Sequence, residues 1–270
     1  MTMIAIPWIA LGVVLGVLLL WLMGFLLVTD FSVPLVRDAQ AYRRVLVIFP
    51  HADDEAISCG GTLHRLATAG SVVTLALLTK GERGTPDAAP DENLKAIRTR
   101  EAQAVSGILQ ITRLVQADFE DGALCAQKPE LGAFLASLIE QERPDLLITY
   151  DLAGFYWHAD HIACSEVVTA LRKASFPEIP LWYVTFPRLV LASARLPAHL
   201  ATSTHIHAKQ TLPTCKLFIG ASVLPKIYAW YSYKSQRAAL TKGLLRLAPI
   251  WFFLSMMLFE YYAEVTTPHG

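Results

Sequence analysis

The chain has 270 residues, of which 54% are hydrophobic and only 17% are charged, and its mean hydropathy is +0.40. An average soluble domain has about 25% charged residues, so part of this chain is expected to lie out of water. The high hydrophobic content excludes a disordered or collagen-like chain. The 23 basic and 23 acidic residues leave no net charge, which argues against a nucleic-acid partner. The four cysteines are widely spaced and form no CxxC pair, so they fit a reducing compartment rather than a disulfide framework or a cysteine zinc site.

The missing charge is concentrated near the N-terminus. Residues 4–28 contain no charged side chain, and a helix of this length would measure about 37 Å, enough to cross a hydrocarbon core of about 30 Å. We therefore predict that residues 1–30 form a transmembrane anchor. A cleaved signal peptide is the alternative, but no basic residue precedes the apolar run and no small-x-small cleavage pattern ends it.

Basic residues follow the predicted anchor, whereas none precedes it. Arg37, Arg43 and Arg44 lie shortly after the apolar run, and short segments rich in Arg and Lys stay on the cytoplasmic side of a membrane. We therefore expect a single-pass membrane protein whose remaining chain faces the cytoplasm. Residues 31–42 are mixed and polar, and they are predicted to form a linker.

Between residues 43 and 240, apolar runs typical of buried parallel strands alternate with helical patterns. This alternation predicts an α/β domain: a Rossmann-like, open and mostly parallel sheet with helices on both faces. The predicted strands are residues 45–49, 72–78, 146–150 and 181–185, and the predicted helices are residues 54–69, 91–108, 129–142 and 162–174.

Residues 241–270 form an apolar and aromatic C-terminal segment. Arg246 and Pro249 interrupt it, so its longest apolar stretch, residues 250–259, is too short to span a membrane. Two interpretations stay open for this segment. Its aromatic residues suit a contact with the membrane interface, but the same pattern fits an ordinary core helix.

Two polar clusters follow two of the predicted strands. Residues 50–55 read Pro-His-Ala-Asp-Asp-Glu, and residues 158–161 read His-Ala-Asp-His. The carboxyl ends of parallel strands share one edge of an open sheet, where ligands bind. We therefore expect the two clusters to meet in one site, although the first cluster alone would also suit a capped helix start.

The residue types in these clusters point to a metal. Imidazoles and carboxylates without a thiolate pair suit a divalent ion of the zinc type that keeps one position open for water. Asp53 and Asp54 are adjacent, so their side chains are expected to point in different directions. We expect one of these carboxylates to bind the metal and the other to handle protons.

Together the two clusters resemble the paired PHPDDE and HPDH signatures of the LmbE/PIG-L family of zinc-dependent de-N-acetylases. The likeness covers residues 43–240, the predicted catalytic domain. Alanines, Ala52 and Ala159, replace the prolines of both signatures, which affects the rigidity of the loops rather than the ligands. Other segments that resemble the family are Leu78 to Glu82, Arg98 with Glu101, and Ser235 with Gln236.

The resemblance implies one zinc ion per chain, although other divalent ions would suit the same donors. The implied metal ligands are His51, Asp54 and His161. The implied catalytic residues are Asp53 as general base, His158 as a positively charged oxyanion stabiliser or acid, and Asp160 as the residue that orients His158.

Two further groups of polar residues allow two interpretations each. Arg98 would either contact the substrate or form a structural ion pair with Glu101, which lies three residues along the same helix. We assign Arg98 to substrate binding. The pair His205 and His207 would share one side of a strand, but we interpret it as solvated rather than as a second ligand set.

The resemblance implies an amide hydrolase that removes the acetyl group from an N-acetylglucosamine-type sugar and releases acetate. Because an anchor is predicted, we expect a lipid-linked substrate similar to N-acetylglucosaminyl-phosphatidylinositol, on which members of the family act. The alternatives are a deacetylase of a soluble N-acetyl sugar conjugate, a metal-dependent phosphoesterase, and a non-catalytic membrane scaffold.

Overall fold

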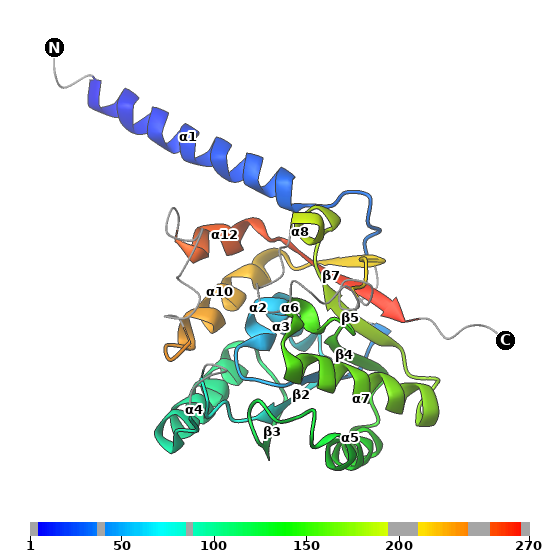
Figure 1. The fold of residues 1–270 in the computed structure, drawn as a ribbon. Helices are drawn as coiled ribbons and strands as arrows, with labels where there is room; N and C mark the ends of the chain where they lie inside the picture. Colours follow the sequence, from blue (N-terminus) through cyan, green and yellow to red (C-terminus); the bar gives the residue numbers. More distant parts are fainter. Residues whose placement is uncertain (1–4, 37–40, 85–88, 194–209, 237–248, 266–270) are drawn as a thin grey trace.

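The computed structural model describes residues 5–36, 41–84, 89–193, 210–236 and 249–265. These residues form a mixed α/β fold around a seven-stranded sheet (Figure 1). From one edge of the sheet to the other, the strands are β3 (Arg113–Phe119), β2 (Val72–Thr79), β1 (Arg44–Phe49), β4 (Leu146–Tyr150), β5 (Leu181–Thr185), β7 (Phe259–Val265) and β6 (Cys215–Phe218).

The sheet is mostly parallel. Strands β1 to β5 pair in parallel, and only β7 runs against its neighbours β5 and β6. The predicted α/β class is therefore confirmed, and all four predicted strands are present. Strands β3, β6 and β7 were not predicted. Because β7 lies inside the sheet, the sheet extends beyond residue 240, where we expected the catalytic domain to end.

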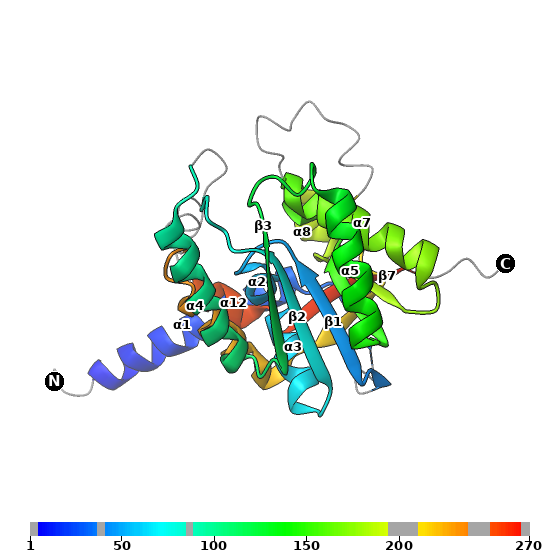
Figure 2. The same ribbon diagram turned by 90° about the horizontal axis from the view of Figure 1, so that it is seen from below.

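Helices cover both faces of the sheet, as the alternation of side chains along β1 requires. Val45, Val47 and Phe49 pack with α2, α3, α4 and α10, while Leu46 and Ile48 pack with α5 and α7 on the opposite face. Figure 2 shows α4 and α5 on opposite sides of the strands. The helices of the domain are α2 (Asp54–Ser58), α3 (Gly60–Thr68), α4 (Glu92–Ile108), α5 (Lys128–Glu142), α6 (Gly154–Trp157), α7 (Ala159–Ser175), α8 (Arg188–Ser193), the short 3₁₀ helix η2 (Gly220–Ser222), α10 (Val223–Ser232) and α12 (Ile250–Met256).

The single helix predicted at 54–69 is wrong, because the structure divides it into α2 and α3. Glu260 of β7 accepts hydrogen bonds from the backbone N–H groups of Gly61, at 3.0 Å, and Thr62, at 2.7 Å. A carboxylate at this position satisfies free N–H groups and complements the dipole of α3. Lys226 of α10 donates to the same carboxylate at 2.6 Å. A strand some 200 positions away in the chain therefore fixes where the second helix begins.

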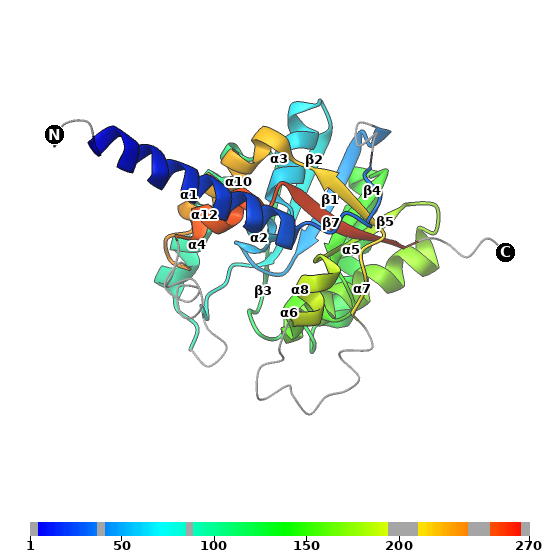
Figure 3. The same ribbon diagram turned by 90° about the horizontal axis from the view of Figure 1, so that it is seen from above.

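The N-terminal apolar run is the helix α1 (Ala5–Val28). Among the described residues, its part Trp8–Val28 is the one helix that is long and apolar enough to cross a membrane, by length and composition. Figure 3 shows α1 lying across α12 and then projecting away from the domain. Beyond α1, residues 34–36 of the predicted linker run beside β6, where the N–H of Val36 donates to the carbonyl of Lys216 at 2.8 Å.

The C-terminal segment is not the ordinary core helix of one interpretation, and its contact with the membrane interface stays a prediction. Its first part is the short helix α12, in which Leu254 and Met256 are buried while Trp251 and Phe253 are exposed. Residues Phe259–Val265 form strand β7 rather than a helix, and the central residues of this strand are buried. The segment is therefore partly core of the sheet and partly a helix with an apolar outer side.

Candidate metal and catalytic site

The two polar clusters meet at the carboxyl ends of the central strands. His51 follows β1, and His161 lies in the first turn of α7, which comes after β4, the parallel neighbour of β1. The Nδ1 atom of His51 lies 3.2 Å from Nε2 of His161. The expected convergence of the clusters on one site is therefore confirmed.

The three implied metal ligands lie close together, and the two histidines face different oxygens of Asp54. Asp54 places one carboxylate oxygen 3.6 Å from His51 Nδ1 and the other 3.4 Å from His161 Nε2. Ligand atoms bound at about 2.1 Å in a tetrahedron lie about 3.4 Å from one another. Two imidazole nitrogens and a carboxylate, all buried, therefore fit a divalent metal ion.

The outer nitrogen of each ligand imidazole has an acceptor that sets its tautomer. His51 Nε2 lies 3.1 Å from Asp121 and 3.2 Å from Asp160, and Nδ1 of His161 lies 3.2 Å from the carbonyl oxygen of Gly154. With a proton on each of these outer nitrogens, the inner nitrogens present lone pairs to each other and to Asp54, as metal-binding histidines do.

The charge state of His51 follows from the same contacts. Burial opposes a charge on its ring, but hydrogen bonds to Asp121, Asp160 and Asp54 hold the pKa of His51 well above its usual value. By contrast, burial together with the neighbouring His51 and His158 lowers the pKa of His161 to about 3. A metal ion would therefore displace a proton from His51 but not from His161.

Two groups of potential ligand atoms, neither of which includes Asp54, lie within 4.8 Å of one another among the described residues: His51 with His158 and His161, and His51 with Asp121 and Asp160. In the second group Asp160 already accepts hydrogen bonds from the backbone of Gly122 and Leu124, at 2.7 and 3.1 Å. We favour the set with Asp54 because its carboxylate faces the inner nitrogens of both histidines.

Asp160 orients both histidines of the pocket, in two ways. Its carboxylate contacts His51, as described above, and its backbone N–H donates to Nδ1 of His158 at 3.3 Å. The expected link from Asp160 to His158 thus runs through the backbone. Burial and the nearby His51 lower the pKa of His158, which disfavours the positive charge expected on this imidazole. With Nδ1 accepting, Nε2 carries the proton and is a hydrogen-bond donor.

The pKa values of the adjacent residues Asp53 and Asp54 are shifted in opposite directions. Burial and the charge of Asp54 raise the pKa of Asp53 to about 7, against the effects of Arg98 and His51. Despite its own burial, Asp54 has a pKa held well below the usual value by His161 and His51. Asp53 is therefore suited to accept a proton near neutral pH, while Asp54 stays ionised.

The backbone at Asp53 has a left-handed conformation, with φ of 111°. Its N–H donates to the carboxylate of Glu55 at 3.3 Å, and that buried carboxylate also accepts a hydrogen bond from the hydroxyl of Tyr233. Left-handed φ is costly for a residue with a side chain. The contact through Glu55 ties this strained turn to α10.

Arg98 points into the site rather than toward Glu101. Its guanidinium donates to the carbonyl of Ala52 at 2.6 Å and lies 3.8 Å from the carboxylate of Asp53. Glu101 instead accepts hydrogen bonds from the backbone N–H and hydroxyl of Ser235, at 3.0 and 2.6 Å. Gly81 makes room for Arg98, since a Cβ there would lie 2.3 Å from the Nε atom of Arg98.

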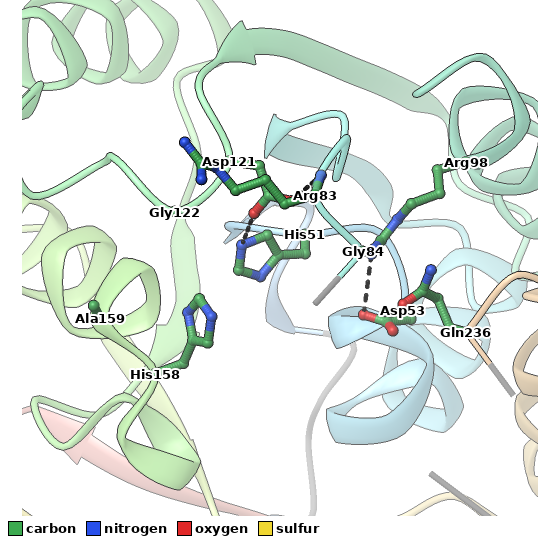
Figure 4. A pocket seen from close by; sticks show the side chains of 10 residues that line it. All are labelled: His51, Asp53, Arg83, Gly84, Arg98, Asp121, Gly122, His158, Ala159 and Gln236. Carbon is green, nitrogen blue, oxygen red and sulfur yellow. Dashed lines mark hydrogen bonds and ion pairs between the residues drawn. The ribbon is translucent and has the colours of Figure 1, made fainter. Parts of the chain in front are cut away.

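A cavity of about 350 Å³ opens over these groups (Figure 4). This volume lies at the lower end of the range for small-molecule sites. Its lining includes predicted residues and residues that sequence reasoning missed, of which Asp121 is the most important because it contacts His51. Asp121 follows β3 at the same edge of the sheet, but that strand was not predicted. The cavity is lined by His51, Asp53, Arg83, Gly84, Arg98, Asp121, Gly122, His158, Ala159 and Gln236.

Other histidines lie away from this site or outside the described residues. His64 contacts the hydroxyl of Ser222 at 3.0 Å on another side of the domain. The pair His205 and His207, which we interpreted as solvated, lies outside the described residues.

Residues 46–172 match the family model of PIG-L, described as GlcNAc-PI de-N-acetylase. This part of the chain is similar to the PIG-L family. The matched PIG-L region contains all the implied metal ligands and catalytic residues, together with Arg98 and Asp121. Tyr233, Gln236 and strand β7 lie beyond it.

Curated relatives cover part of the chain. A Bacillus anthracis protein named probable N-acetyl-α-D-glucosaminyl L-malate deacetylase 2 is 35% identical over 141 residues, which are 50% of this chain and 62% of the relative. A 1D-myo-inositol 2-acetamido-2-deoxy-α-D-glucopyranoside deacetylase from Salinispora arenicola is 29% identical over 191 residues, 60% of this chain and 61% of the relative. The chain therefore spans about three fifths of the length of these relatives.

Solved structures share the fold of the PIG-L region and its surroundings. An N,N'-diacetylchitobiose deacetylase from Pyrococcus horikoshii superposes with a TM-score of 0.61 at 19% sequence identity, covering 87% of this chain and 90% of that protein. At this identity the likeness shows a common fold.

Proposed function

We propose that this protein is a metal-dependent amide hydrolase that removes the acetyl group from an N-acetylglucosamine-type sugar and releases acetate. The observation that carries the proposal is the close approach of His51, Asp54 and His161 to one another, next to a cavity lined by Asp53, whose pKa is raised to about 7. The relatives named for deacetylating glucosaminyl malate and glucosaminyl inositol support the same substrate class.

Six residues of the site have a part in the proposed reaction. A zinc ion held by His51, Asp54 and His161 would lower the pKa of a water molecule and polarise the acetamide carbonyl. Asp53 accepts the proton of the attacking water and returns it to the leaving amine. His158 donates a hydrogen bond from Nε2 to the oxygen that gains charge. Arg98 holds Asp53 in place and faces the sugar.

We also propose that α1 anchors the protein as a single-pass membrane protein, with the catalytic domain in the cytoplasm and a lipid-linked sugar as substrate. The length and composition of α1 support the membrane part of this proposal. The names of the relatives support a soluble N-acetyl sugar conjugate instead. Both substrate types place the same acetamide in the same cavity.

The test is acetate release by the purified, zinc-loaded full chain in detergent or lipid. We would compare N-acetylglucosaminyl malate, N-acetylglucosaminyl inositol and N-acetylglucosaminyl-phosphatidylinositol. Release of acetate from at least one of them, abolished in Asp53→Asn, is the expected result. Absence of acetate release from all three with a fully loaded metal site would refute the deacetylase proposal, whereas activity on the soluble substrates alone would refute only the lipid-linked substrate.

A metal-dependent phosphoesterase is a second candidate, because the carboxylates of Asp121 and Asp160 lie on the far side of His51 and extend the set of potential ligands. Two-metal phosphoryl transfer needs two ions about 3.5 to 4 Å apart. Asp160 already accepts two backbone hydrogen bonds, which favours one ion per chain. Metal content measured by mass spectrometry distinguishes the candidates: one ion is expected for the deacetylase and two for the phosphoesterase.

A further inference from the structure

The helix α12 packs against the C-terminal half of α1. The indole Nε1 of Trp21 donates to the hydroxyl of Ser255 at 2.9 Å. Gly24 lies against Met256 so closely that a Cβ there would be 2.1 Å from its sulfur. The ring of Phe25 stacks on Phe259, with centroids 6.3 Å apart. The last two turns of α1 are thus joined to α12 and to the start of β7 (Figure 3).

The length of α1 determines whether its contact with α12 lies inside the bilayer or in water. The 21 residues Trp8–Val28 form a helix of about 31 Å, which only just crosses a hydrocarbon core of about 30 Å. If the chain from Trp21 onward lay in water, residues 8–20 would span only about 20 Å. An α1 that crosses the bilayer therefore keeps Trp21 and Gly24 within it, together with the helix packed on them.

Polar contacts mark where α1 leaves the apolar region. The N–H of Asp30 donates to the hydroxyl of Tyr261 at 2.8 Å, and Lys216 Nζ donates to the carbonyl of Asp30 at 2.6 Å. Trp21 lies seven residues before the end of α1 at Val28, or about 10 Å along the helix. Helices that lie in a membrane interface are buried about 5 to 10 Å below its surface, which is the depth this contact gives to α12.

The outer side of α12 has the chemistry that such a position needs. The helix, Ile250–Met256, contains no charged residue. Trp251 and Phe253 are 48% and 40% exposed, whereas Leu254 and Met256 are buried against the protein. Tryptophan is enriched at membrane interfaces because its ring is apolar and its N–H is polar. In water, the exposed rings of α12 would lie beside the equally exposed apolar surface of α1.

We propose that α12 is embedded in the same leaflet interface as the cytoplasmic end of α1, so that lipid covers Trp251 and Phe253. The inference rests on the proposed anchor but not on the proposed chemistry. Lipid is the occupant because α12 packs on α1 through Ser255 and Met256, and the apolar surface of α1 has the length of a bilayer. The catalytic domain is then held to the membrane by two helices and has a fixed orientation toward it.

The test is tryptophan quenching by brominated lipid in the full chain, reconstituted into phosphatidylcholine vesicles. Bromine on the acyl chains quenches only tryptophans that contact lipid. We expect the quenched intensity to fall in Trp8→Phe, which reports insertion of α1, and also in Trp251→Phe. Trp230→Phe is the matched control, because Trp230 is 1% exposed, and it should leave the quenched intensity unchanged.

Each other result overturns the inference in a recognisable way. A loss of quenching in Trp8→Phe but not in Trp251→Phe would mean that α1 inserts without α12. No effect in either variant would refute the anchor as well. If nanodiscs contained two copies of the chain each and brominated lipid did not quench Trp251, the exposed side of α12 would be assigned to contact with a second copy. Acetate release measured on soluble substrates is independent of all three outcomes, so failure of the proposed reaction is recognised separately.

Discussion

The carboxylate of Asp121 lies 3.1 Å from Nε2 of His51, on the opposite side of the ring from Asp54 and His161. This contact holds His51 in the tautomer that presents Nδ1 to a metal. Because the imidazole is fixed from outside the ligand set, the metal site depends on the loop after β3 as well as on the two sequence clusters.

We predict that Asp121→Asn weakens zinc binding by about 10- to 100-fold, the usual effect of removing such an outer carboxylate. The amide keeps the shape of the side chain but no longer favours a proton on Nε2. Zinc affinity is measured by competition with a chelating dye. Asp118→Asn is the control, because Asp118 is exposed and pairs with surface lysines; equal loss of affinity in both variants would contradict the assigned role.

Separate substitution of the two adjacent aspartates, Asp53 and Asp54, should distinguish metal binding from proton transfer. We expect Asp53→Asn to keep its zinc and lose about 10² to 10⁴ in kcat, the usual contribution of a general base. Asp54→Asn and His161→Ala should lose the zinc itself. Metal content and turnover are measured on the same preparations. Full zinc occupancy in His161→Ala would show that the ligand assignment is wrong.

The rate should depend on the protonation of Asp53. Because a general base must be unprotonated, kcat/KM should fall about tenfold per pH unit below the pKa of Asp53 and level off above it. Burial raises this pKa to about 7 and Arg98 lowers it, while a bound cation shifts the acid limb to lower pH.

The position of Arg98 gives this pH dependence a specific control. Arg98→Gln removes a positive charge 3.8 Å from Asp53, so the acid limb should move to higher pH, whereas Arg98→Lys should keep it near the wild-type position. The pH profile of kcat/KM on a soluble substrate is the measurement. An acid limb that does not move in Arg98→Gln would show that a group other than Asp53 controls it.

Gly81 and Gly70 offer a matched pair of substitutions. Both have left-handed φ values, of 67° and 95°, but a Cβ at Gly81 would collide with Arg98, while nothing lies within 4 Å of a Cβ at Gly70. We expect each change to alanine to destabilise the fold by about 1 to 2 kcal/mol through backbone strain. Only Gly81→Ala should also lower kcat/KM, because it displaces Arg98. Thermal denaturation and kinetics on both variants distinguish strain from displacement.

The strands that could be predicted from the sequence are those buried on both faces. The runs at β1, β2, β4 and β5 are continuous and apolar, so their pattern reflects their burial. Strand β3 is an edge strand with polar residues at several positions, and β7 contains Glu260 and Glu264. Their strand structure depends on pairing with neighbours, which no local pattern reveals.

The same limit explains what was found and what was missed in the site. His51, Asp54 and His161 belong to dense polar clusters after predictable strands, so their convergence could be expected from topology. Asp121 stands alone after an unpredicted strand, and its contact with His51 becomes visible only when β3 is placed beside β2. Likewise, the pKa of Asp53 depends on burial, which the order of residues does not determine.

The buried pair of Lys226 and Glu260 gives a last prediction about stability. Their side chains are 0% and 1% exposed, and the carboxylate of Glu260 also accepts hydrogen bonds from the backbone N–H groups at the start of α3. Breaking such a pair leaves an uncompensated buried charge, which costs about 3 to 5 kcal/mol. We expect Glu260→Gln to lower the free energy of unfolding by this amount, measured by chemical denaturation in detergent. Glu166→Gln breaks the more exposed pair with Lys128 and should cost less than about 1 kcal/mol. Similar losses in the two variants would mean that the buried carboxylate is not what holds β7, α10 and α3 together.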